Sequence, residues 1–286
     1  VFSIGVLMNT TSLETFLVLS KIRNFTKASE ALFVAQSTVT NRIAELEKEL
    51  GQPLFIRSSR SLKLTEAGIK FTDYANRIIA LEKSAVAALN TQDFSEESLH
   101  IGTTNTIYEC HLRTPLLDYM QEHRKVNAKV TISHSMELLH ALQDDLLDFA
   151  FTYIPLKKQG FNCQCFKKDE LVLVCRCSDT TYQKGITRKE LPKLNYLFCN
   201  FALQEVGLFI RQLFPDNYQF PFEIDNSTKL LDFVLAGLGY SFLPLSLVKK
   251  EIEANRLRAV PLLDFDSPKI NNYLTMKETL KFPFAL

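Results

Sequence analysis

The chain has 286 residues, of which 46% are hydrophobic and 23% are charged, and its formal net charge is only +1. This composition is typical of an ordered globular protein, and the length suits two or three compact units rather than one core. The sequence has no apolar run of the roughly eighteen residues that a membrane span needs, and no secretory leader pattern at its start. We therefore expect a cytoplasmic protein.

The positive charge is concentrated near the N-terminus. Residues 9–65 carry eight Lys or Arg side chains against five Glu, which is a modest indication that this segment binds a polyanion. The seven residues before Met8 match no element, so we expect either a misplaced start or residues foreign to the native protein.

Three helices are predicted before residue 51. Ser12 is expected to cap the first, and Thr26 the second, which is short and ends near Phe33. The third is predicted from Gln36 to Leu50, and Gly51 ends it as a left-handed residue. Its inner stripe comprises Val39, Ile43, Leu46 and Leu50.

Two helices joined by a tight turn, the second with a polar outer face, form a helix-turn-helix that inserts into the major groove of DNA. Gln can read adenine, Arg can read guanine, and Ser or Thr suit several base edges. Lys27 and the amides at the start of the second helix would bind phosphate. The predicted DNA-binding residues of these helices are Thr26, Lys27, Gln36, Ser37, Thr38, Thr40, Asn41 and Arg42.

An extended hairpin follows from Pro53, with apolar ends and a polar tip. Arg57, Arg60 and Lys63 fit a wing that lies along the DNA backbone or in the minor groove, where narrow A·T tracts attract arginine. A solvated loop is the alternative for any one of these charges.

A long helix is predicted from residue 66 to residue 90, capped by Thr65. Apolar residues recur at steps of four and three, the seam of a coiled coil, which favours dimerisation. A helix that lies on its own domain is the alternative. The seam comprises Ala67, Phe71, Tyr74, Ile78, Leu81, Ala85 and Ala88.

Beyond the polar joint "NTQDFSEES", short apolar strands alternate with helices, which indicates an α/β fold with mainly parallel sheets. Strands are expected at 99–102, 129–133, 148–153, 170–176, 195–200 and 240–244. About 190 residues could form two α/β lobes around a cleft, the usual place for a small ligand.

The N-terminal stretch "LETFLVLSKIRNFTKASEALFVAQSTVTNRIAELEKELGQPLFIR", followed by "LTEAG", resembles the LysR-type transcriptional regulators. The glycine-rich stretch "VLAGLGYSFLP" (234–244) is similar to the strand entry of their effector domains, in which Gly237 and Gly239 would allow a tight helix-to-strand turn. The ending "KETLKFPFAL" stands where the family continues into a closing helix, so we expect truncation.

This resemblance implies three parts. Residues 9–65 would be a winged helix-turn-helix DNA-binding domain, 66–92 a dimerisation helix and 98–286 an effector-binding domain of periplasmic-binding-protein type. Lobe I would span about 98–166 and 265–286, and lobe II about 167–264. The protein would form homodimers or homotetramers on double-stranded promoter DNA.

The resemblance also implies an effector between the lobes, bound by strand ends and helix N-termini. The matching residues are Thr103, Thr104, Asn105, Thr106, Ser135, Thr152, Tyr153, Asn200, Phe201, Asn226 and Ser227. The threonines resemble those of the cysteine-biosynthesis regulators, although loop polarity and helix capping are alternatives. No cation is placed for a strongly charged ligand, so an amino acid, a sulfur compound or a small carboxylate are the candidates.

The cysteines leave one alternative function open. Cys163/Cys165 and Cys175/Cys177 form Cys-x-Cys pairs, but no zinc spacing with histidine is present, so buried structural thiols are expected and neither a metal nor a cofactor. A DNA-binding regulator that senses cysteine oxidation, through these four thiols or Cys110 and Cys199, is the alternative to a ligand-responsive one. An enzyme is not expected, because no nucleophile–base constellation or phosphate-binding glycine loop is visible.

Overall fold

The computed structural model describes residues 9–57, 61–90, 97–199, 206–267 and 269–286. The chain divides into two compact units, residues 1–94 and 95–286. Among the helices of these described ranges, none is both long and apolar enough to cross a membrane.

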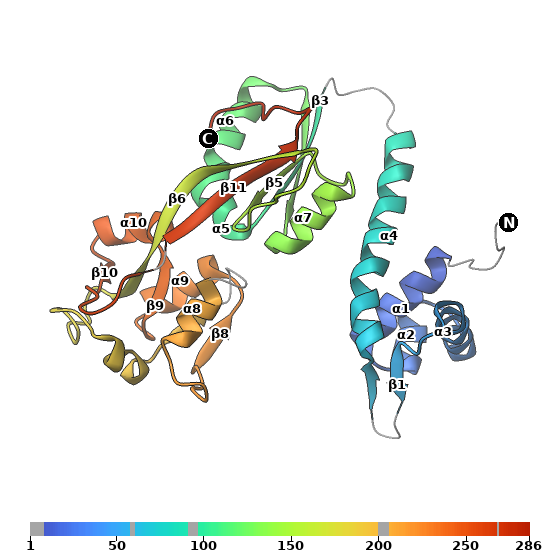
Figure 1. Ribbon diagram of the computed structural model, residues 1–286, viewed down its shortest axis with the longest axis horizontal. Coiled ribbons are helices and arrows are strands. Elements are labelled where there is room, and N and C mark those ends of the chain that lie inside the picture. Colours follow the sequence, from blue (N-terminus) through green and yellow to red (C-terminus); the bar gives the residue numbers. More distant parts are fainter. Residues whose placement is uncertain (1–8, 58–60, 91–96, 200–205, 268) are drawn as a thin grey trace. The chain divides into compact units, whose positions relative to one another are not determined.

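The first unit is a helical domain with a two-stranded wing (Figure 1). Its elements are α1 (Thr10–Ile22), α2 (Phe25–Ala31), α3 (Gln36–Leu50), β1 (Phe55–Arg57), β2 (Leu62–Leu64) and α4 (Glu66–Asn90). The fully buried Phe16 of α1 and Ile43 of α3 meet Ala75 and Ile79 of α4 in one core. The strands pair antiparallel, with Phe55 opposite Leu64. The predicted bounds of α3 and α4 are confirmed, and Gly51 ends α3 with φ +64°.

Both of the first two helices begin earlier than predicted. Asn9 caps α1, because its side chain accepts a hydrogen bond from the N–H of Ser12 at 2.7 Å. Asn24 caps α2 in the same way, accepting from Lys27 N at 3.0 Å. Ser12 and Thr26 therefore lie inside the first turns, and their prediction as caps was wrong. Asparagine is as good a cap as serine or threonine, so each helix start offered two candidate caps within three residues of each other.

The second unit contains a mixed seven-stranded sheet with the order β10-β6-β11-β5-β3-β4, to which β9 adds beside β6. Its strands are β3 (Glu97–Thr103), β4 (Val126–Ile132), β5 (Phe149–Thr152), β6 (Phe161–Arg176), β9 (Ser241–Pro244), β10 (Leu257–Ala259) and β11 (Lys269–Lys277). A separate parallel pair joins β7 (Leu197–Cys199) to β8 (Phe222–Ile224).

The prediction of mainly parallel sheets holds for only part of this unit. β3 pairs parallel with β4 and β5, but β11 pairs antiparallel with β5 and β6, and β6 pairs antiparallel with β9 and β10. The long strand β6 pairs with β11 through its first half and with β9 and β10 through its second half. It therefore runs from one hydrophobic core to the other.

Helices cover both faces of the β3–β4–β5 part of the sheet. Side chains alternate along β5, so Phe149 and Phe151 pack with Leu116 of α6 (Arg113–Glu122), whereas Ala150 packs with Leu138 of α7 (Ser135–Gln143). The helix that leads into α6 consists of α5 (Asn105–Ile107) and a π-helical turn, η1 (Tyr108–Leu112).

The other core surrounds β7, β9 and the second half of β6, and it is rich in aromatic rings. Its central side chains are Tyr196, Phe198, Phe214 and Phe242. The surrounding helices are η2 (Arg188–Lys193, a 3-10 helix), α8 (Val206–Gln212), α9 (Ser227–Leu235) and α10 (Leu245–Glu253). Gly237 has φ +80°, and a Cβ on Gly239 would lie 2.1 Å from the carbonyl oxygen of Asn195, so the tight turn from α9 to β9 needs both glycines.

Candidate functional site

The outer face of α3 is polar, as a helix that enters a groove requires. Val39, Ile43 and Leu46 are buried against the core, whereas Gln36, Ser37 and Asn41 are exposed and Thr38, Thr40 and Arg42 are partly exposed. Because the inner and outer residues alternate with the helical period, the sequence pattern alone fixes which face is presented.

Internal hydrogen bonds restrain three of the predicted DNA-binding side chains. The Thr26 hydroxyl donates to Oε1 of Gln36 at 3.1 Å, which ties the start of α2 to the start of α3. The Thr40 hydroxyl donates to the carbonyl oxygen of Gln36. Arg42 donates from Nη1 to the hydroxyl of Thr15 on α1 at 3.2 Å, so its guanidinium starts from a fixed position beside α1.

The wing is fastened to α3 and α4 through its two ends. Oε1 of Glu47 on α3 accepts hydrogen bonds from the amides of Leu54 at 2.8 Å and Phe55 at 3.1 Å. The Thr65 hydroxyl donates to the carbonyl oxygen of Pro53 and accepts from the amide of Gly68, so Thr65 also caps α4 as predicted. Sequence analysis did not identify Glu47.

The predicted cations divide between described and undescribed positions. Lys27 and Lys63 are exposed. Arg60 and the side chain of Arg57 lie outside the described residues.

The α4 helix has two apolar faces rather than one seam. Ala75 and Ile79 are buried, and Ala67 and Phe71 pack partly against the core of their own unit, so the last two do not belong to an exposed seam as predicted. Tyr74 is 58% exposed, and the helix continues outward with the exposed side chains Ile78, Leu81, Ala85 and Leu89. The side chain of Ala88 is outside the described residues.

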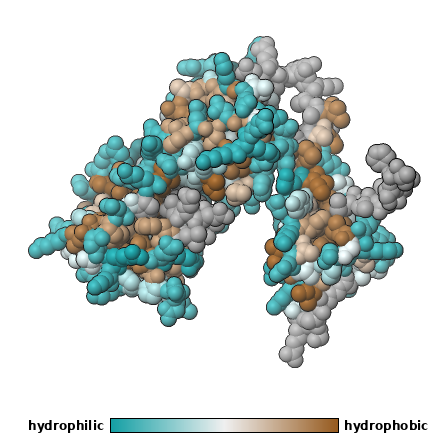
Figure 2. Space-filling view, viewed as in Figure 1, coloured by the Kyte–Doolittle hydropathy of each residue, from teal (hydrophilic) through white to brown (hydrophobic). Residues whose placement is uncertain are grey.

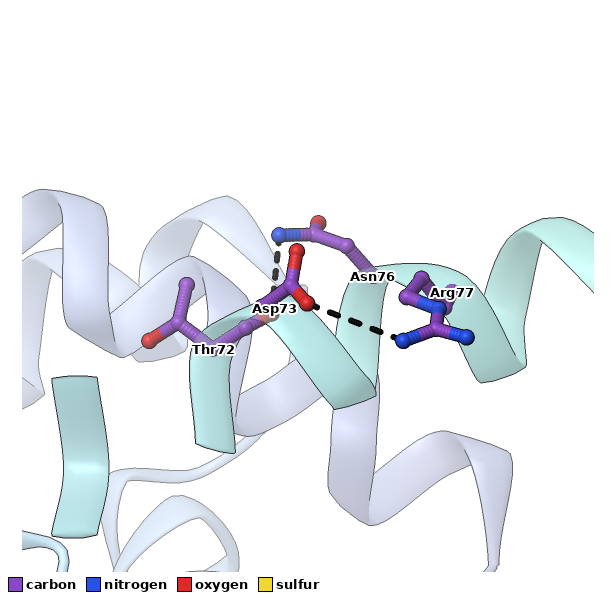
Figure 3. A network of polar contacts seen from close by, with 4 residues as sticks. All are labelled: Thr72, Asp73, Asn76 and Arg77. Carbon is purple, nitrogen blue, oxygen red and sulfur yellow. Dashed lines mark hydrogen bonds and ion pairs between the residues drawn. The ribbon is translucent and has the colours of Figure 1, made fainter. Parts of the chain in front are cut away.

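Hydrophobic residues gather on α4 in the space-filling view (Figure 2). On other sides of α4, polar side chains bond to groups about one helical turn away. Asn76 donates to the carbonyl oxygen of Thr72 at 2.9 Å, and Arg77 lies 3.9 Å from the carboxylate of Asp73 (Figure 3). The exposed apolar side chains of α4 therefore lie beside polar surfaces of the same helix.

A cavity of about 250 Å³ lies in the second unit. Six of the predicted effector residues line it, namely Thr104, Asn105, Thr106, Tyr153, Asn226 and Ser227. They come from the end of β3 and the start of α5, from the end of β5 and from the start of α9, so segments far apart in sequence meet there. Two other hollows, of about 420 and 610 Å³, share no lining residue with it.

Direct hydrogen bonds join the start of α5 to the start of α9 across this cavity. Nδ2 of Asn105 donates to Oδ1 of Asn226 at 3.2 Å and to the hydroxyl of Thr228 at 2.6 Å. The hydroxyls of Thr106 and Ser227 lie 2.5 Å apart, and both residues are buried. We call these contacts the α5–α9 bridge.

The floor of the cavity contains buried hydroxyls. Oγ1 of Thr104 is buried and makes no hydrogen bond of normal geometry to any described residue. Burial raises the pKa of the Tyr153 hydroxyl, and the neighbouring hydroxyls of Thr104 and Thr106 oppose that shift only in part. Tyr153 is therefore neutral at physiological pH, and the hydroxyl of Thr104 is available to a bound ligand.

Three predicted effector residues lie behind the cavity wall instead of lining it. Thr103 and Thr152 are fully buried, and their hydroxyls donate to the backbone carbonyls of Thr104 and Ile154. The Ser135 hydroxyl accepts from the amide of Tyr153 at 3.1 Å. These three hydroxyls therefore bond to the backbone around the cavity. Asn200 and Phe201 lie outside the described residues.

Sequence analysis missed four lining residues: Ile132, Ser133, His134 and Asp225. All four follow or end strands, which was the signal used for their neighbours. The end of β4 was predicted one residue late, and β8 was not predicted at all. Among the described residues, no Lys or Arg lines the cavity, and the ionisable lining side chains besides Tyr153 are His134 and Asp225.

The six cysteines are present as free thiols. Burial raises the pKa of the Cys110 thiol to about 11 and also raises the pKa of Cys175. No cluster of three or more His, Cys, Asp or Glu side chains suited to a metal ion occurs in the described part of the chain.

Comparison with known proteins adds the following similarities. Residues 10–69 match the family described as bacterial regulatory helix-turn-helix protein, lysR family, and residues 92–279 match the LysR substrate binding domain. The chain is 28% identical to the HTH-type transcriptional regulator CitR of Bacillus subtilis, over 91% of both chains. It is 32% identical to the uncharacterized HTH-type transcriptional regulator YwqM of Bacillus subtilis, over 88% of this chain and 87% of YwqM.

A similar fold is present in the crystal structure of full-length CbnR complexed with its target DNA. The TM-score is 0.58 at 19% sequence identity, and the match covers 96% of this chain and 95% of CbnR. At this identity the likeness concerns the fold alone.

Proposed function

Because the chain belongs to the LysR family of transcription regulators, we propose that a small polar effector in the 250 Å³ cavity controls how its helix-turn-helix units bind promoter DNA. The relatives compared above are named as regulators and not as enzymes. The cavity belongs to the effector-binding domain, and the polar face of α3 belongs to the DNA-binding domain.

The observation that carries the effector proposal is the buried Thr104 hydroxyl beside the α5–α9 bridge. The Thr104 hydroxyl makes no hydrogen bond of normal geometry and interacts with the neighbouring Tyr153 hydroxyl, so it retains hydrogen-bonding capacity that a ligand can use. The bridge joins residues of proposed lobe I to residues of proposed lobe II. A ligand that binds one arrangement of this bridge more tightly than another therefore shifts the balance between them.

The DNA part of the proposal assigns base contacts to Gln36, Ser37, Thr38 and Asn41, and backbone contacts to Lys27 and the wing. The exposure of Lys27, Gln36, Ser37, Asn41 and Lys63 supports it, and Thr38 is partly exposed. Arg42 must leave or share its bond to Thr15 to reach a base. A homodimer formed through the exposed stripe of α4 would present two such units to a two-part site.

Thermal-shift measurements on the full chain test the effector assignment. Amino acids, sulfur compounds and small carboxylates are screened, because a ligand that binds only the folded state raises the melting temperature as its concentration exceeds Kd. Thr104→Val preserves shape and removes the hydroxyl, so it should abolish most of the shift. Thr131→Val, on the neighbouring strand β4 but outside the cavity lining, is the matched control. An undiminished shift in Thr104→Val would refute the assignment.

Titration against duplex DNA tests the wing separately. Lys63→Ala should weaken binding and reduce its dependence on salt, because one phosphate contact is lost. Lys83→Ala, exposed on α4, serves as the control. The same affinity and salt slope for both variants would remove the wing from the interface.

Two of the thiols, Cys110 and Cys175, are poorly suited to the redox alternative. A cysteine that senses oxidants needs a lowered pKa and exposure, whereas Cys110 and Cys175 are both shifted upward by burial. Mass mapping after mild peroxide distinguishes the two functions, because ligand control requires no sulfenate or disulfide.

A further inference from the structure

Phe33 occupies the turn between α2 and α3 in an arrangement that folding does not explain. It is 95% exposed, more than any other large hydrophobic side chain among the described residues, and its φ is +55°. The left-handed region is unfavourable for a bulky side chain, because Cβ crowds the following carbonyl group. Phe33 thus bears a conformational cost and gains almost no packing.

Other helix ends of the same chain show what this position normally holds. Five helix ends in the described residues have the same pair of terminal hydrogen bonds, in which the left-handed residue donates three residues back and the next residue donates five residues back. The left-handed residues are Phe33, Gly51, Asp145, Gly237 and Asn255. Four are of the types that tolerate this conformation. The aromatic exception lies inside the helix-turn-helix.

The neighbours of Phe33 belong to the surface that we assign to DNA. Gln36, the first residue of α3, follows three positions later, so the two Cα atoms are at most about 11 Å apart. Gln36 and Ser37 are exposed, and Gln36 is bonded to Thr26 at the start of α2. A duplex that receives the start of α3 therefore comes within reach of the Phe33 ring.

We propose that Phe33 is a DNA-contact residue whose ring packs against a thymine methyl group at the edge of the major groove. The thymine methyl is the apolar group that this groove presents, and phenylalanine is one of the side chains that read it. Contact with DNA removes from water the apolar surface that the free protein exposes. This inference rests on the proposed DNA binding and adds an aromatic element to a face that sequence analysis described as polar.

The test uses the full chain and a duplex that the wild-type protein enriches from a random-sequence pool. Phe33→Asn keeps the left-handed turn and removes the ring. It should raise the melting temperature by about 2–4 °C while weakening DNA binding roughly tenfold. Asn255→Phe places a ring in the equivalent turn after α10, and it should lower the melting temperature and leave DNA affinity unchanged.

Replacement of thymine by uracil in the duplex identifies the group contacted. The wild type should lose several-fold in affinity, whereas Phe33→Asn should be insensitive to the missing methyl groups. Equal affinity of Phe33→Asn and wild type, or equal sensitivity of both to uracil, would overturn the inference. A lower melting temperature for Phe33→Asn would also overturn the inference. So would a change in its oligomeric mass without a loss of DNA affinity.

Failure of the wider function gives a different result. If the wild-type chain enriches no duplex, then DNA binding and the role of Phe33 are both rejected. If the wild type enriches a duplex that Phe33→Asn binds equally well, only the role of Phe33 is rejected.

Discussion

Replacing Glu47 by alanine tests how the wing is held against α3. Its Oε1 accepts the amides of Leu54 and Phe55 at 2.8 and 3.1 Å, and both of these residues are buried. Water cannot readily replace the acceptor, and an orphaned buried donor costs about 1–3 kcal/mol. Two orphaned amides therefore predict a loss of about 2–6 kcal/mol in the free energy of unfolding of this unit.

Two further variants separate the acceptor from general effects of substitution. Glu47→Gln keeps an oxygen acceptor and loses the charge, so it should cost only about 1 kcal/mol. Glu49→Ala removes an exposed carboxylate from the same helix and should change stability by less than about 0.5 kcal/mol. Denaturant unfolding measures all three variants.

Affinity for the enriched duplex should fall with the stability of the wing. Glu47→Ala should weaken DNA binding even at temperatures where it remains folded, because the wing that carries Lys63 is no longer fixed relative to α3. If Glu47→Ala unfolds at the same denaturant concentration as Glu49→Ala, the two amide bonds do not hold the wing and the reasoning is refuted.

Three other predictions concern different surfaces. Leu81→Asp on the exposed stripe of α4 should raise the dimer dissociation constant at least tenfold in sedimentation experiments, whereas Lys83→Asp, on the other side of the helix, should not. The pKa of Cys110 is raised to about 11 in the folded state, so the neutral thiol stabilises the fold fully below pH 9, and this contribution is lost as the pH rises toward 11. Between pH 9 and pH 11 the free energy of unfolding should therefore fall more for the wild type than for Cys110→Ala. Asp225→Asn should weaken an amino-acid effector several-fold in calorimetry and leave a simple carboxylate unaffected, with the exposed Asp216→Asn as control; equal effects on both ligands would exclude an ion pair at Asp225.

Local signals predicted the first unit well. The bounds of α3 follow from an apolar repeat and from Gly51, both of which lie within sixteen residues. The missed caps, Asn9 and Asn24, differ from the predicted ones by only a few positions. The division of α4 into a buried and an exposed face was not predictable, because Phe71 and Tyr74 look alike in the apolar repeat and only tertiary packing separates them.

Strand β6 shows why the second unit was harder. Sequence analysis predicted only its apolar end, 170–176, because the first half carries Lys167, Lys168 and Asp169. That half is ordered by β11, whose paired residues lie about a hundred positions further along the chain. Non-local pairing of this kind leaves little trace in local composition.

The cavity also depends on contacts between residues that are far apart in the sequence. Its lining distinguishes among the ligand classes that sequence analysis left open. Asn105 and Asn226 are 121 residues apart, and only the fold brings their side chains together. Asp225 lines the cavity and no Lys or Arg of the described part of the chain does, so a doubly negative ligand would meet repulsion from Asp225. An amino acid that places its ammonium group toward Asp225 and its carboxylate toward the hydroxyl of Thr104 would gain an ion pair and a hydrogen bond. A simple carboxylate satisfies only one of these sites. If the proposed cavity binds the effector, we expect it to prefer a zwitterionic or neutral polar ligand over an anionic one.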